Sequence, residues 1–547
     1  MRQGDVARGR GMSSETSASA GQAGGDLEAR RYLTVFLPLW VAMVALQSGL
    51  LIHDVGAAWI ISRETESRSL VALAQTASAL PFFLFALPAG ALADMVERRR
   101  IVQAAAFGLA GLSLVVALAA LSGTITVPLL LLASFVNGCC NAAFTPSWQA
   151  MTPELVSGER LQGALALNSL GVNIARSIGP LTSGLLLFAA GPAAAFLFNA
   201  VLYSAVALAF IMIAPRSAPM AAQESLLSAV RGGLAYVRHE RGLQAVALRA
   251  VAFFIFAATF WALVPVVVRE WFHGTSLMLG LMVGSVGLGA IIGARALKSL
   301  RRRFDLDQLM LGAGLLAALA MACVPLAPLP AALAALHAVL GFCWLLSFSS
   351  IHLAAQLRLT PWIRARGTAV YLISVFGSLA VGSFASGLLA DHLGISVTFW
   401  LSAAGLLLAT LAAFARLRIA IAAPVKLAHS AILPAVTVLD RDAAIMVTIT
   451  YAPRDGEQQA AERVLSHLKA ARLRTGARYW SSQRTGTLLV ERIGYDSGER
   501  LGRSAMRHMA EDVAAEAELL GLLAEAPEIA IAQETPRAAQ TGGSASK

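Results

Sequence analysis

The sequence predicts an all-α membrane protein with twelve transmembrane helices in two six-helix halves, followed by a small cytoplasmic α+β domain. Three observations lead to this fold class. Of the 547 residues, 57% are hydrophobic and only 14% are charged, which leaves a soluble chain too little polar surface. A segment near residue 90 recurs farther along the chain. From residue 444 onward, β-branched runs and charged amphipathic segments replace the long apolar stretches.

One constant offset of 203 residues relates the two halves. It carries Gly90 and the run Arg98 to Arg100 onto Gly293 and the run Arg301 to Arg303. It also carries seven positions between residues 179 and 196 onto identical residues between 382 and 399. Single matches are common in a Gly- and Leu-rich sequence, but a constant offset over about a hundred residues is not. Two parallel repeats of this kind place a substrate path between them.

The number of membrane spans follows from the apolar runs, because a helix needs about 20 apolar residues to cross the hydrocarbon core. Loops after the even-numbered runs hold most of the arginines, with Arg160 alone after run 4 and groups of at least three after the others, whereas loops after the odd-numbered runs hold only Arg63, Arg68 and Arg269. Basic loops face the cytoplasm, so the even-numbered loops and both termini are expected there. The runs are residues 33–60, 70–93, 101–121, 125–148, 163–188, 192–213, 245–268, 276–297, 308–326, 330–356, 367–389 and 394–416.

Composition also sets the expected domain boundaries. Both ends are rich in small polar residues, which is typical of disordered tails. Apolar residues recur at intervals of three and four positions between 225 and 239. This spacing indicates an amphipathic helix in the central loop. The expected organisation is a tail at 1–30, a first half at 31–214, an amphipathic linker at 215–243, a second half at 244–420, a linker at 421–443, the α+β domain at 444–533 and a tail at 534–547.

The C-terminal domain reads as β-α-β-β-α with one further strand. Residues 444–451 are rich in β-branched residues, as in a strand, and residues 456–471 read as a helix. Residues 476–484 and 487–493 form two strands around a turn, and 497–524 is helical in pattern. With a last strand at 529–532, this order predicts a ferredoxin-like fold. Its polar and aromatic residues are candidates for a ligand pocket or for an ordinary core: Tyr451, His467, Tyr479, Trp480, Glu491 and His508.

Several classes of function are not supported by the sequence. The chain lacks a Gly-x-x-x-x-Gly-Lys-Ser/Thr loop, so it is not expected to use ATP. Its four cysteines form no CxxC or Cys/His spacing, so neither zinc nor a disulfide framework is indicated. No metal site and no cofactor are expected. We find no nucleophile–base arrangement, hence no catalytic residue and no enzyme. The net charge of +11 arises from short loops, and nucleic acid is not an expected partner.

A motif in the second loop carries a family resemblance. Gly90-Ala-Leu-Ala-Asp-Met-Val-Glu-Arg-Arg-Arg100 resembles the loop 2–3 signature of the major facilitator superfamily, with Met95 and Glu97 as departures. Stretches at 55–59, 142–156, 164–180 and 366–371 resemble its enterobactin-exporter-like branch, the transmembrane secretion effectors. The resemblance covers about residues 30–420 and implies the major facilitator fold. It also implies a gating loop formed by Gly90, Asp94, Arg98, Arg99 and Arg100.

Gly179-Pro180 in span 5 resembles a Gly-Pro motif of the superfamily's drug antiporters. Proline removes a backbone donor, and glycine thins the helix. The motif therefore suits a bending point for rocking of the halves, and it equally suits tight helix packing.

Ionisable residues inside spans are costly and usually functional. His53 and Asp54 stand side by side in span 1. A buried carboxylate beside an imidazole is able to exchange a proton near neutral pH, so we expect this pair to couple transport to protons. The alternative is that both lie near the outer end of the span, in contact with water, without a special role.

Arg176 lies about half-way along span 5. An unpaired arginine there is expensive, so it is expected either to bind an anionic substrate group or to pair with Asp94 or Glu154. The ion pair is the favoured alternative. Four polar residues are further candidates for the cavity lining, although most such residues make interhelical hydrogen bonds: Gln75, Asn137, Asn141 and Asn173.

The expected function is secondary active transport by alternating access, most simply proton-coupled efflux (antiport) of a small organic compound. The protein is expected as a multi-pass protein of the bacterial cytoplasmic (inner) membrane. Its expected partners are the lipid bilayer, a small-molecule substrate and protons. Two alternatives stay open: an importer or facilitator of the same fold, and a membrane-anchored sensor whose C-terminal domain binds a ligand.

Overall fold

A computed structural model describes most of the chain. The described residues are 32–156, 160–215, 238–359, 364–418, 427–428, 430–433, 444–505 and 508–533. Both predicted tails lie outside them, and so does the amphipathic segment of the central loop up to residue 237. The chain forms two compact units, one made of membrane helices and one that holds the C-terminal domain.

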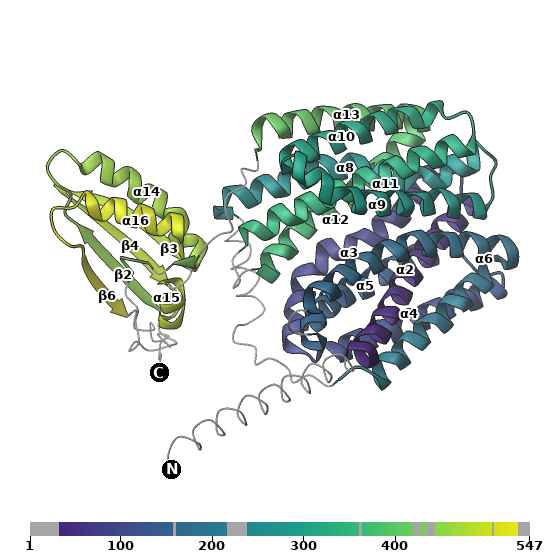
Figure 1. Ribbon diagram of the computed structural model, residues 1–547, viewed down its shortest axis with the longest axis horizontal. Coiled ribbons are helices and arrows are strands. Elements are labelled where there is room, and N and C mark those ends of the chain that lie inside the picture. The colour runs from purple at the N-terminus through teal and green to yellow at the C-terminus, as the bar shows by residue number, and fades with distance from the viewer. Residues whose placement is uncertain are drawn as a thin grey trace, which may run out of the picture. The chain divides into compact units, whose positions relative to one another are not determined.

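The first half of the helical bundle follows the predicted spans closely. Each element begins or ends within a few residues of its apolar run, because the charged loop residues cannot enter the hydrocarbon region. The elements are η1 (Tyr32–Phe36), α2 (Leu37–Glu64), α3 (Arg68–Met95), α4 (Arg98–Leu121), α5 (Val127–Leu155) and α6 (Arg160–Met212), shown in Figure 1.

The long helix α6 contains two spans. At 53 residues it is about twice the length needed to cross a membrane. Gly191 breaks it with φ 81° and ψ −179°, and Pro192 follows directly. Such a backbone conformation favours glycine because it lacks a Cβ. The described residues contain eleven helices that are long and apolar enough to span a membrane, and the break in α6 brings the number of spans to the predicted twelve.

The second half repeats the pattern. Helix α10 begins with a capping box in which Asp305 and Gln308 satisfy each other's backbone donors. The elements are α8 (Arg241–Glu270), α9 (Ser276–Arg303), α10 (Leu306–Cys323), η2 (Val324–Leu326), α11 (Pro330–Arg358), α12 (Arg364–Leu393) and α13 (Ile395–Arg416).

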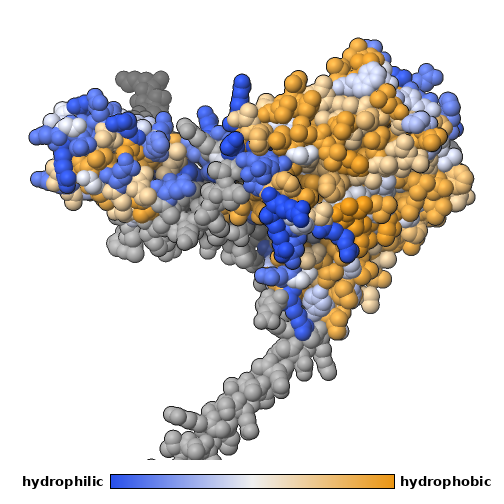
Figure 2. Space-filling view, turned by 45° about the horizontal axis from the view of Figure 1, so that its top comes forward, coloured by the Kyte–Doolittle hydropathy of each residue, from blue (hydrophilic) through white to orange (hydrophobic). Residues whose placement is uncertain are grey.

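Hydrophobic side chains cover most of the visible face of the helical unit in Figure 2. Large apolar residues on this unit are widely exposed, among them Leu121 at 68% and Val201 at 63%. A soluble protein rarely exposes apolar surface this extensive. The lateral surface therefore fits the hydrocarbon of a bilayer, and the prediction of a multi-pass membrane protein is confirmed.

The C-terminal domain has the predicted ferredoxin-like order. Its four-stranded antiparallel sheet runs β3-β4-β2-β6, and β2 alternates strictly between buried and half-buried residues. The sheet packs against α14 and α16 around a core that includes Val447, Ile449 and Leu465. The elements are β2 (Ile445–Tyr451), α14 (Gln458–Thr475), β3 (Tyr479–Thr485), β4 (Leu488–Tyr495), α15 (Gly498–Ala505), β5 (His508–Met509), α16 (Ala510–Gly521) and β6 (Glu528–Gln533).

The single helix predicted over 497–524 is wrong. The structure divides it into α15 and α16 with the short strand β5 between them. Strand β5 pairs with β1 (Leu427–Ala428) in the connecting segment. This pairing joins residues about 80 positions apart, so the periodicity of 497–524 alone contains no sign of it.

Candidate functional site

An ion pair joins the two halves at one end of the bundle, which carries the loops after spans 1, 7 and 11 and is called the odd-loop end below. Arg68 begins α3, and Glu270 ends α8. Arg68 Nε lies 3.2 Å from Glu270 Oε1, and Nη2 lies 2.8 Å from Oε2, a bidentate arrangement. Arg68 Nη1 also donates to the carbonyl of Ala390 in α12 at 2.6 Å. One arginine of the first half thus binds two helices of the second half.

Asp391 caps the start of α3 from the opposite half. Its carboxylate accepts hydrogen bonds from the backbone N–H of Arg68 at 2.7 Å and of Ser69 at 3.1 Å, and from Ser67 Oγ at 3.3 Å. The first N–H groups of a helix lack partners inside the helix. An aspartate normally satisfies them from the N-cap position of the same helix, whereas here it belongs to α12.

Arg269 satisfies the end of α2 in the same manner. It donates to the carbonyls of Ser62 and Thr65, the latter at 2.7 Å, and it pairs with Glu270 at 2.9 Å. The loop between α2 and α3 is therefore held from both sides by the second half. We name the group of Arg68, Arg269, Glu270 and Asp391 the odd-loop lock. Sequence reasoning counted its arginines only as exceptions to the loop charge bias.

Small residues continue the contact between the halves toward the middle of the bundle. A Cβ on Gly280 of α9 would lie 2.6 Å from the carbonyl oxygen of Pro180 and 3.0 Å from Gly184 Cα, both in α6. Across α3 and α12, Thr76 Oγ1 donates to the carbonyl of Ala380 at 3.0 Å. The helices approach this closely only because glycine has no side chain.

Asp54 connects three helices of the first half. Its Oδ1 accepts hydrogen bonds from Ser78 Oγ of α3 at 2.8 Å and from Asn137 Nδ2 of α5 at 3.1 Å. Asn137 is 2% exposed. The structure therefore brings together two residues that the sequence singled out separately, and it adds Ser78, which follows the candidate Gln75 by one helical turn on α3.

His53 makes no hydrogen bond to Asp54, and the role of the two residues in proton coupling stays a prediction. His53 is 1% exposed, and its ring packs edge-on against Phe196 at a centroid distance of 5.6 Å. Both ring nitrogens lack a hydrogen-bond partner within the described residues. Consecutive residues of an α-helix point about 100° apart, so Asp54 faces α3 and α5 while His53 faces the second part of α6.

Arg176 does not form the favoured ion pair with Glu154. That carboxylate is bound by Arg98, and Arg176 has no ion pair or hydrogen bond to any described residue. The Asp94 side chain lies outside the described part. Arg176 is half-buried.

The other candidate cavity residues are less closely connected. Asn141 accepts a hydrogen bond from Thr145 of its own helix at 3.0 Å. Asn173 donates to the carbonyl of Ser169 at 2.8 Å. Gln75 is half-buried and makes no hydrogen bond to a described residue. These contacts leave the lining of the cavity a prediction.

Gly179 lies at a tight helix contact. A Cβ there would lie 2.8 Å from the carbonyl oxygen of Ser48 in α2. Within α6 the backbone leaves helical geometry at Gly191 and not at Gly179-Pro180. Packing is therefore the visible role of the motif, and bending there stays a prediction.

The arginines of the predicted gating loop contact their own half. Arg98 pairs with Glu154 and donates to the carbonyl of Ala150 at 3.3 Å. Arg99 donates to the carbonyl of Ile211 at 2.6 Å, and Arg100 pairs with Glu97 at 2.8 Å. The surroundings of Gly90 and the side chain of Asp94 lie outside the described part, so the implied latch between the halves stays a prediction.

The profile of the transmembrane secretion effector family matches residues 31–496 of this chain. The chain belongs to this family of major facilitator transporters. The match extends beyond the helices into β4 of the C-terminal domain. Members of this family are transporters and not enzymes.

Individual relatives of this transporter are distant. A staphyloferrin A transporter of Staphylococcus aureus is 22% identical over 248 residues, which cover 45% of this chain and 62% of the relative. Macrolide efflux protein A of Streptococcus pyogenes is 22% identical over 262 residues, covering 47% of this chain and 64% of the relative. The matches thus span less than two thirds of these relatives.

Solved structures show the same fold. A bacterial homologue of the human lysosomal transporter Spinster, in an inward-facing and unoccupied conformation, aligns with a TM-score of 0.55 at 14% identity and covers 70% of this chain and 96% of that one. A mutant of the nucleoside transporter NupG aligns with a TM-score of 0.55 at 13% identity, covering 70% and 99%. The predicted major facilitator fold is confirmed.

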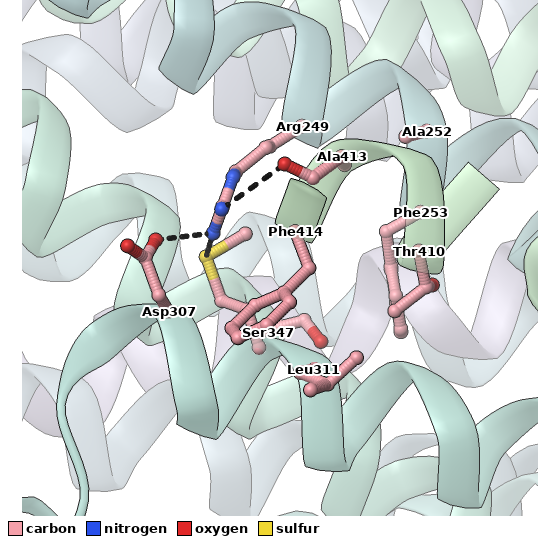
Figure 3. A pocket seen from close by; sticks show the side chains of 10 residues that line it. Arg249, Ala252, Phe253, Asp307, Leu311, Ser347, Thr410, Ala413 and Phe414 are labelled. Atoms are coloured by element: carbon pink, nitrogen blue, oxygen red, sulfur yellow. Dashed lines mark hydrogen bonds and ion pairs between the residues drawn. The ribbon is translucent and has the colours of Figure 1, made fainter. Parts of the chain in front are cut away.

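The transporter also holds a buried cation in its second half that sequence reasoning missed. Arg249 of α8 is 3% exposed, pairs with Asp307 at 2.6 Å and donates to the carbonyl of Ala413 at 3.2 Å (Figure 3). The adjoining cavity of ≈ 20 Å³ has room for about one water molecule. This site is too small for a substrate, and it joins α8, α10 and α13 instead. The sequence feature that could have predicted this ion pair is the single arginine inside the apolar run 245–268.

A charged cluster occupies the core of the C-terminal domain. Arg472 is completely buried and pairs with Glu516 at 2.6 Å and Glu491 at 3.4 Å. Tyr451 and Trp480 donate to Glu491 at 2.6 Å and 2.8 Å. Arg472, Glu491 and Glu516 bind one another, and only Arg472 Nη2 lacks a hydrogen-bond partner among the described residues. The cluster is therefore a largely satisfied polar core.

His508 completes this cluster. Its Nε2 lies 3.0 Å from Arg472 Nη1, and its Nδ1 lies 2.9 Å from the carbonyl of Ser504. Burial lowers the pKa of His508, and the nearby guanidinium lowers it further. Glu516 also binds Ser430 Oγ and the Ala431 N–H, each at 2.6 Å. The domain therefore holds part of the segment that sequence reasoning assigned to a linker.

Proposed function

We propose that this protein exports a small organic compound in exchange for protons by alternating access. We place it in the bacterial inner membrane with both termini in the cytoplasm. The loop charge bias supports this orientation, and it puts the odd-loop end on the outer side. A macrolide efflux protein among the distant relatives supports export as the direction.

The observation that carries this proposal is the odd-loop lock. The ion pair between Arg68 and Glu270 is partly exposed, at 27% and 24%. Such pairs each contribute about 0–1 kcal/mol. A closure built from a few weak polar contacts is able to open at small cost, as alternating access requires. The state described here is accordingly closed on the outer side.

Asp54 is the proposed proton carrier. Its described partners, Ser78 and Asn137, are both neutral. A carboxylate fixed in an ion pair stays ionised, because protonation would leave an unpaired buried cation. Neutral partners remove that penalty, and the Ser78 hydroxyl is able to donate to the ionised form or accept from the protonated form.

Compound accumulation in cells with and without the protein tests this proposal. An exporter lowers the cellular level of its substrate, and a proton uncoupler abolishes the difference. Accumulation above the level of control cells identifies an importer instead. A difference that persists unchanged with the uncoupler contradicts proton coupling.

Deleting residues 430–547 separates transport from sensing. A transporter keeps its activity without the C-terminal domain or loses only its regulation. A sensor whose C-terminal domain binds the ligand loses its function entirely. The intact protein at equal expression level is the control.

A further inference from the structure

Arg176 stands out among the cations within the membrane spans because it is half-buried and its charge is unmatched among the described residues. Arg249, in the other half, has the carboxylate of Asp307 at 2.6 Å. Arg176 has no such partner among the described residues. A charged side chain within a membrane span normally faces a partner or a water-filled cavity, because it is costly elsewhere.

The contacts of its neighbours fix the direction in which Arg176 projects. Gly179 packs on Ser48 of α2, whereas the backbone N of Ser177 lies 2.7 Å from where a Cβ on Gly287 of α9 would be. At 100° per residue, Arg176 falls on the strip of α6 between these two contacts. Because α2 belongs to the first half and α9 to the second, this strip faces the space between the halves.

Arg176 also lies too far from Asp54 to be neutralised by it. Helix α2 and the first span of α6 run in the same direction, since Gly179 meets Ser48 and Ser183 Oγ donates to the carbonyl of Ile52. Because Gly179 is level with Ser48, Arg176 is level with a position three residues before Ser48 on α2. Asp54 lies nine residues beyond that position, which is about 13 Å along the helix axis. This places Arg176 near the middle of the membrane, where major facilitator substrates are held.

A second unsatisfied group lies one turn from Arg176. Asn173 is 7% exposed, and its Oδ1 has no hydrogen-bond partner among the described residues. Its Nδ2 is already bound to the carbonyl of Ser169. A buried acceptor without a donor normally has a ligand or water against it. Arg176 and Asn173 therefore place a cation and a hydrogen-bond acceptor one helical turn apart on α6.

We propose that Arg176 and Asn173 bind the transported compound, and that the compound is a small organic anion carrying a hydrogen-bond donor near its anionic group. A guanidinium binds carboxylate or phosphate oxygens in a bidentate manner, and Asn173 Oδ1 accepts from a neighbouring hydroxyl or amine. This inference rests on the proposed transport function, and it names the class of substrate.

The first test is export from intact cells, with the cellular pool of small molecules as the probe. Compounds that the wild-type protein depletes from cells are sorted on an anion-exchange resin at neutral pH. We expect them to be retained, and we expect Arg176→Gln to reduce their export at least tenfold while Arg176→Lys keeps part of it. Arg160→Gln, on an exposed residue of the same helix, is the matched control. Export of unretained compounds, or full export by Arg176→Gln, overturns the proposal.

The second test needs no transport. The melting temperature of the purified protein is measured with citrate, with 3-hydroxybutyrate and with choline. We expect at least one of the two hydroxy acids to stabilise the wild-type protein, and choline not to. Arg176→Gln should lose that stabilisation, and Asn173→Leu should weaken it. Equal shifts in the wild-type protein and Arg176→Gln overturn the anion site. If the melting temperatures show the anion site but cells export no compound, only the proposed transport function is contradicted.

Discussion

The Asp391 carboxylate, near the end of α12, accepts a hydrogen bond from the backbone N–H of Arg68, the first residue of α3, at 2.7 Å. A helix of the first half is thereby capped by the second half. Any movement that separates the halves at this end must leave the first N–H groups of α3 unsatisfied until water reaches them. The stability of the closed state and the stability of one helix end are therefore linked.

Removing this cap should favour the state that is open at the odd-loop end. We expect Asp391→Ala to cost the closed state about 1 kcal/mol, the usual value of an N-cap, which shifts the closed-to-open ratio about fivefold. An impermeant maleimide applied from outside to cysteine-free protein carrying Ala72→Cys reports the open state. Ala72 lies behind the lock, where α3 meets Gly387 of α12.

Asp391→Asn is the matched control for this experiment, because an asparagine oxygen still caps a helix. In the Asp391→Asn variant, the cysteine at position 72 should react with maleimide at a rate close to that measured with Asp391 intact. Equal labelling of Asp391→Ala and wild type would show that the cap does not hold the outer side closed.

Reversing the ion pair should test the lock independently. Arg68→Glu or Glu270→Arg alone places like charges together, so either should raise the labelling rate and lower transport. The double variant restores opposite charges and should recover part of both. We expect a coupling of about 1 kcal/mol or less, because the pair is partly exposed. Additive effects of the two single changes would contradict a direct interaction.

Asp54, and not His53, should determine the dependence of transport on protons. Asp54→Asn keeps the size of the side chain but removes the titrating group, so uncoupler-sensitive export should be lost. His53→Phe should retain it, because the imidazole makes no described hydrogen bond and packs on Phe196 as an aromatic ring would. An unchanged uncoupler response in Asp54→Asn would exclude that residue as the proton carrier.

The glycine contact between α6 and α9 should be sensitive to one methyl group. In Gly280→Ala the new Cβ would lie 2.6 Å from the Pro180 carbonyl oxygen, so the helices must separate. We expect a lower melting temperature in detergent and reduced transport. Gly312→Ala in α10 is the control, because no described residue beyond its own stretch of helix has an atom within 4 Å of the Cβ position. That change should be neutral or slightly stabilising, since alanine favours a helix by about 1 kcal/mol.

The C-terminal domain should lose stability as the solution becomes acidic. The pKa of His508 is lowered below its usual value of 6.5 in the folded domain, mainly by burial. Below pH 6.5 the unfolded form binds a proton that the folded form excludes, so folding weakens as pH falls toward the lowered value. The slope for one proton is about 1.4 kcal/mol per pH unit at most.

Hydrogen exchange of peptides from residues 445–533 in the intact protein, corrected for intrinsic rates, measures this effect. His508→Gln removes the titrating ring and should flatten the dependence between pH 6.5 and 5. A slope equal to that of the wild-type protein would assign the pH dependence to the carboxylates of the cluster.

The sequence predicted well those features that depend on neighbours along the chain. The spans followed from apolar runs, and the break between spans 5 and 6 fell at Gly191-Pro192, where local chemistry ends a helix. The first strand of the C-terminal domain followed from its β-branched residues, and the next two followed from the turn between them. The prediction failed at 497–524, where the pairing of Leu427 with Met509 replaced a continuous helix.

The candidate site was less accessible to sequence reasoning because its contacts join distant residues. Asp54 was identified by its cost in the membrane, but the direction of its side chain toward Ser78 and Asn137 depended on which helices surround α2. The same reasoning paired it with His53, its neighbour in sequence, which a helix turns away by about 100°.

The sequence by itself determined the membrane location, the twelve spans, the two repeated halves and the family, because hydrophobicity and local backbone preference act over a few turns. Only the tertiary structure decided that Arg68, Arg269, Glu270 and Asp391 form one lock and that Arg176 has no described partner. Those facts depend on which side chains meet across the interface between the halves, over 300 residues apart in the case of Arg68 and Asp391. Local sequence preferences do not determine such contacts, because they depend on the packing of the whole bundle.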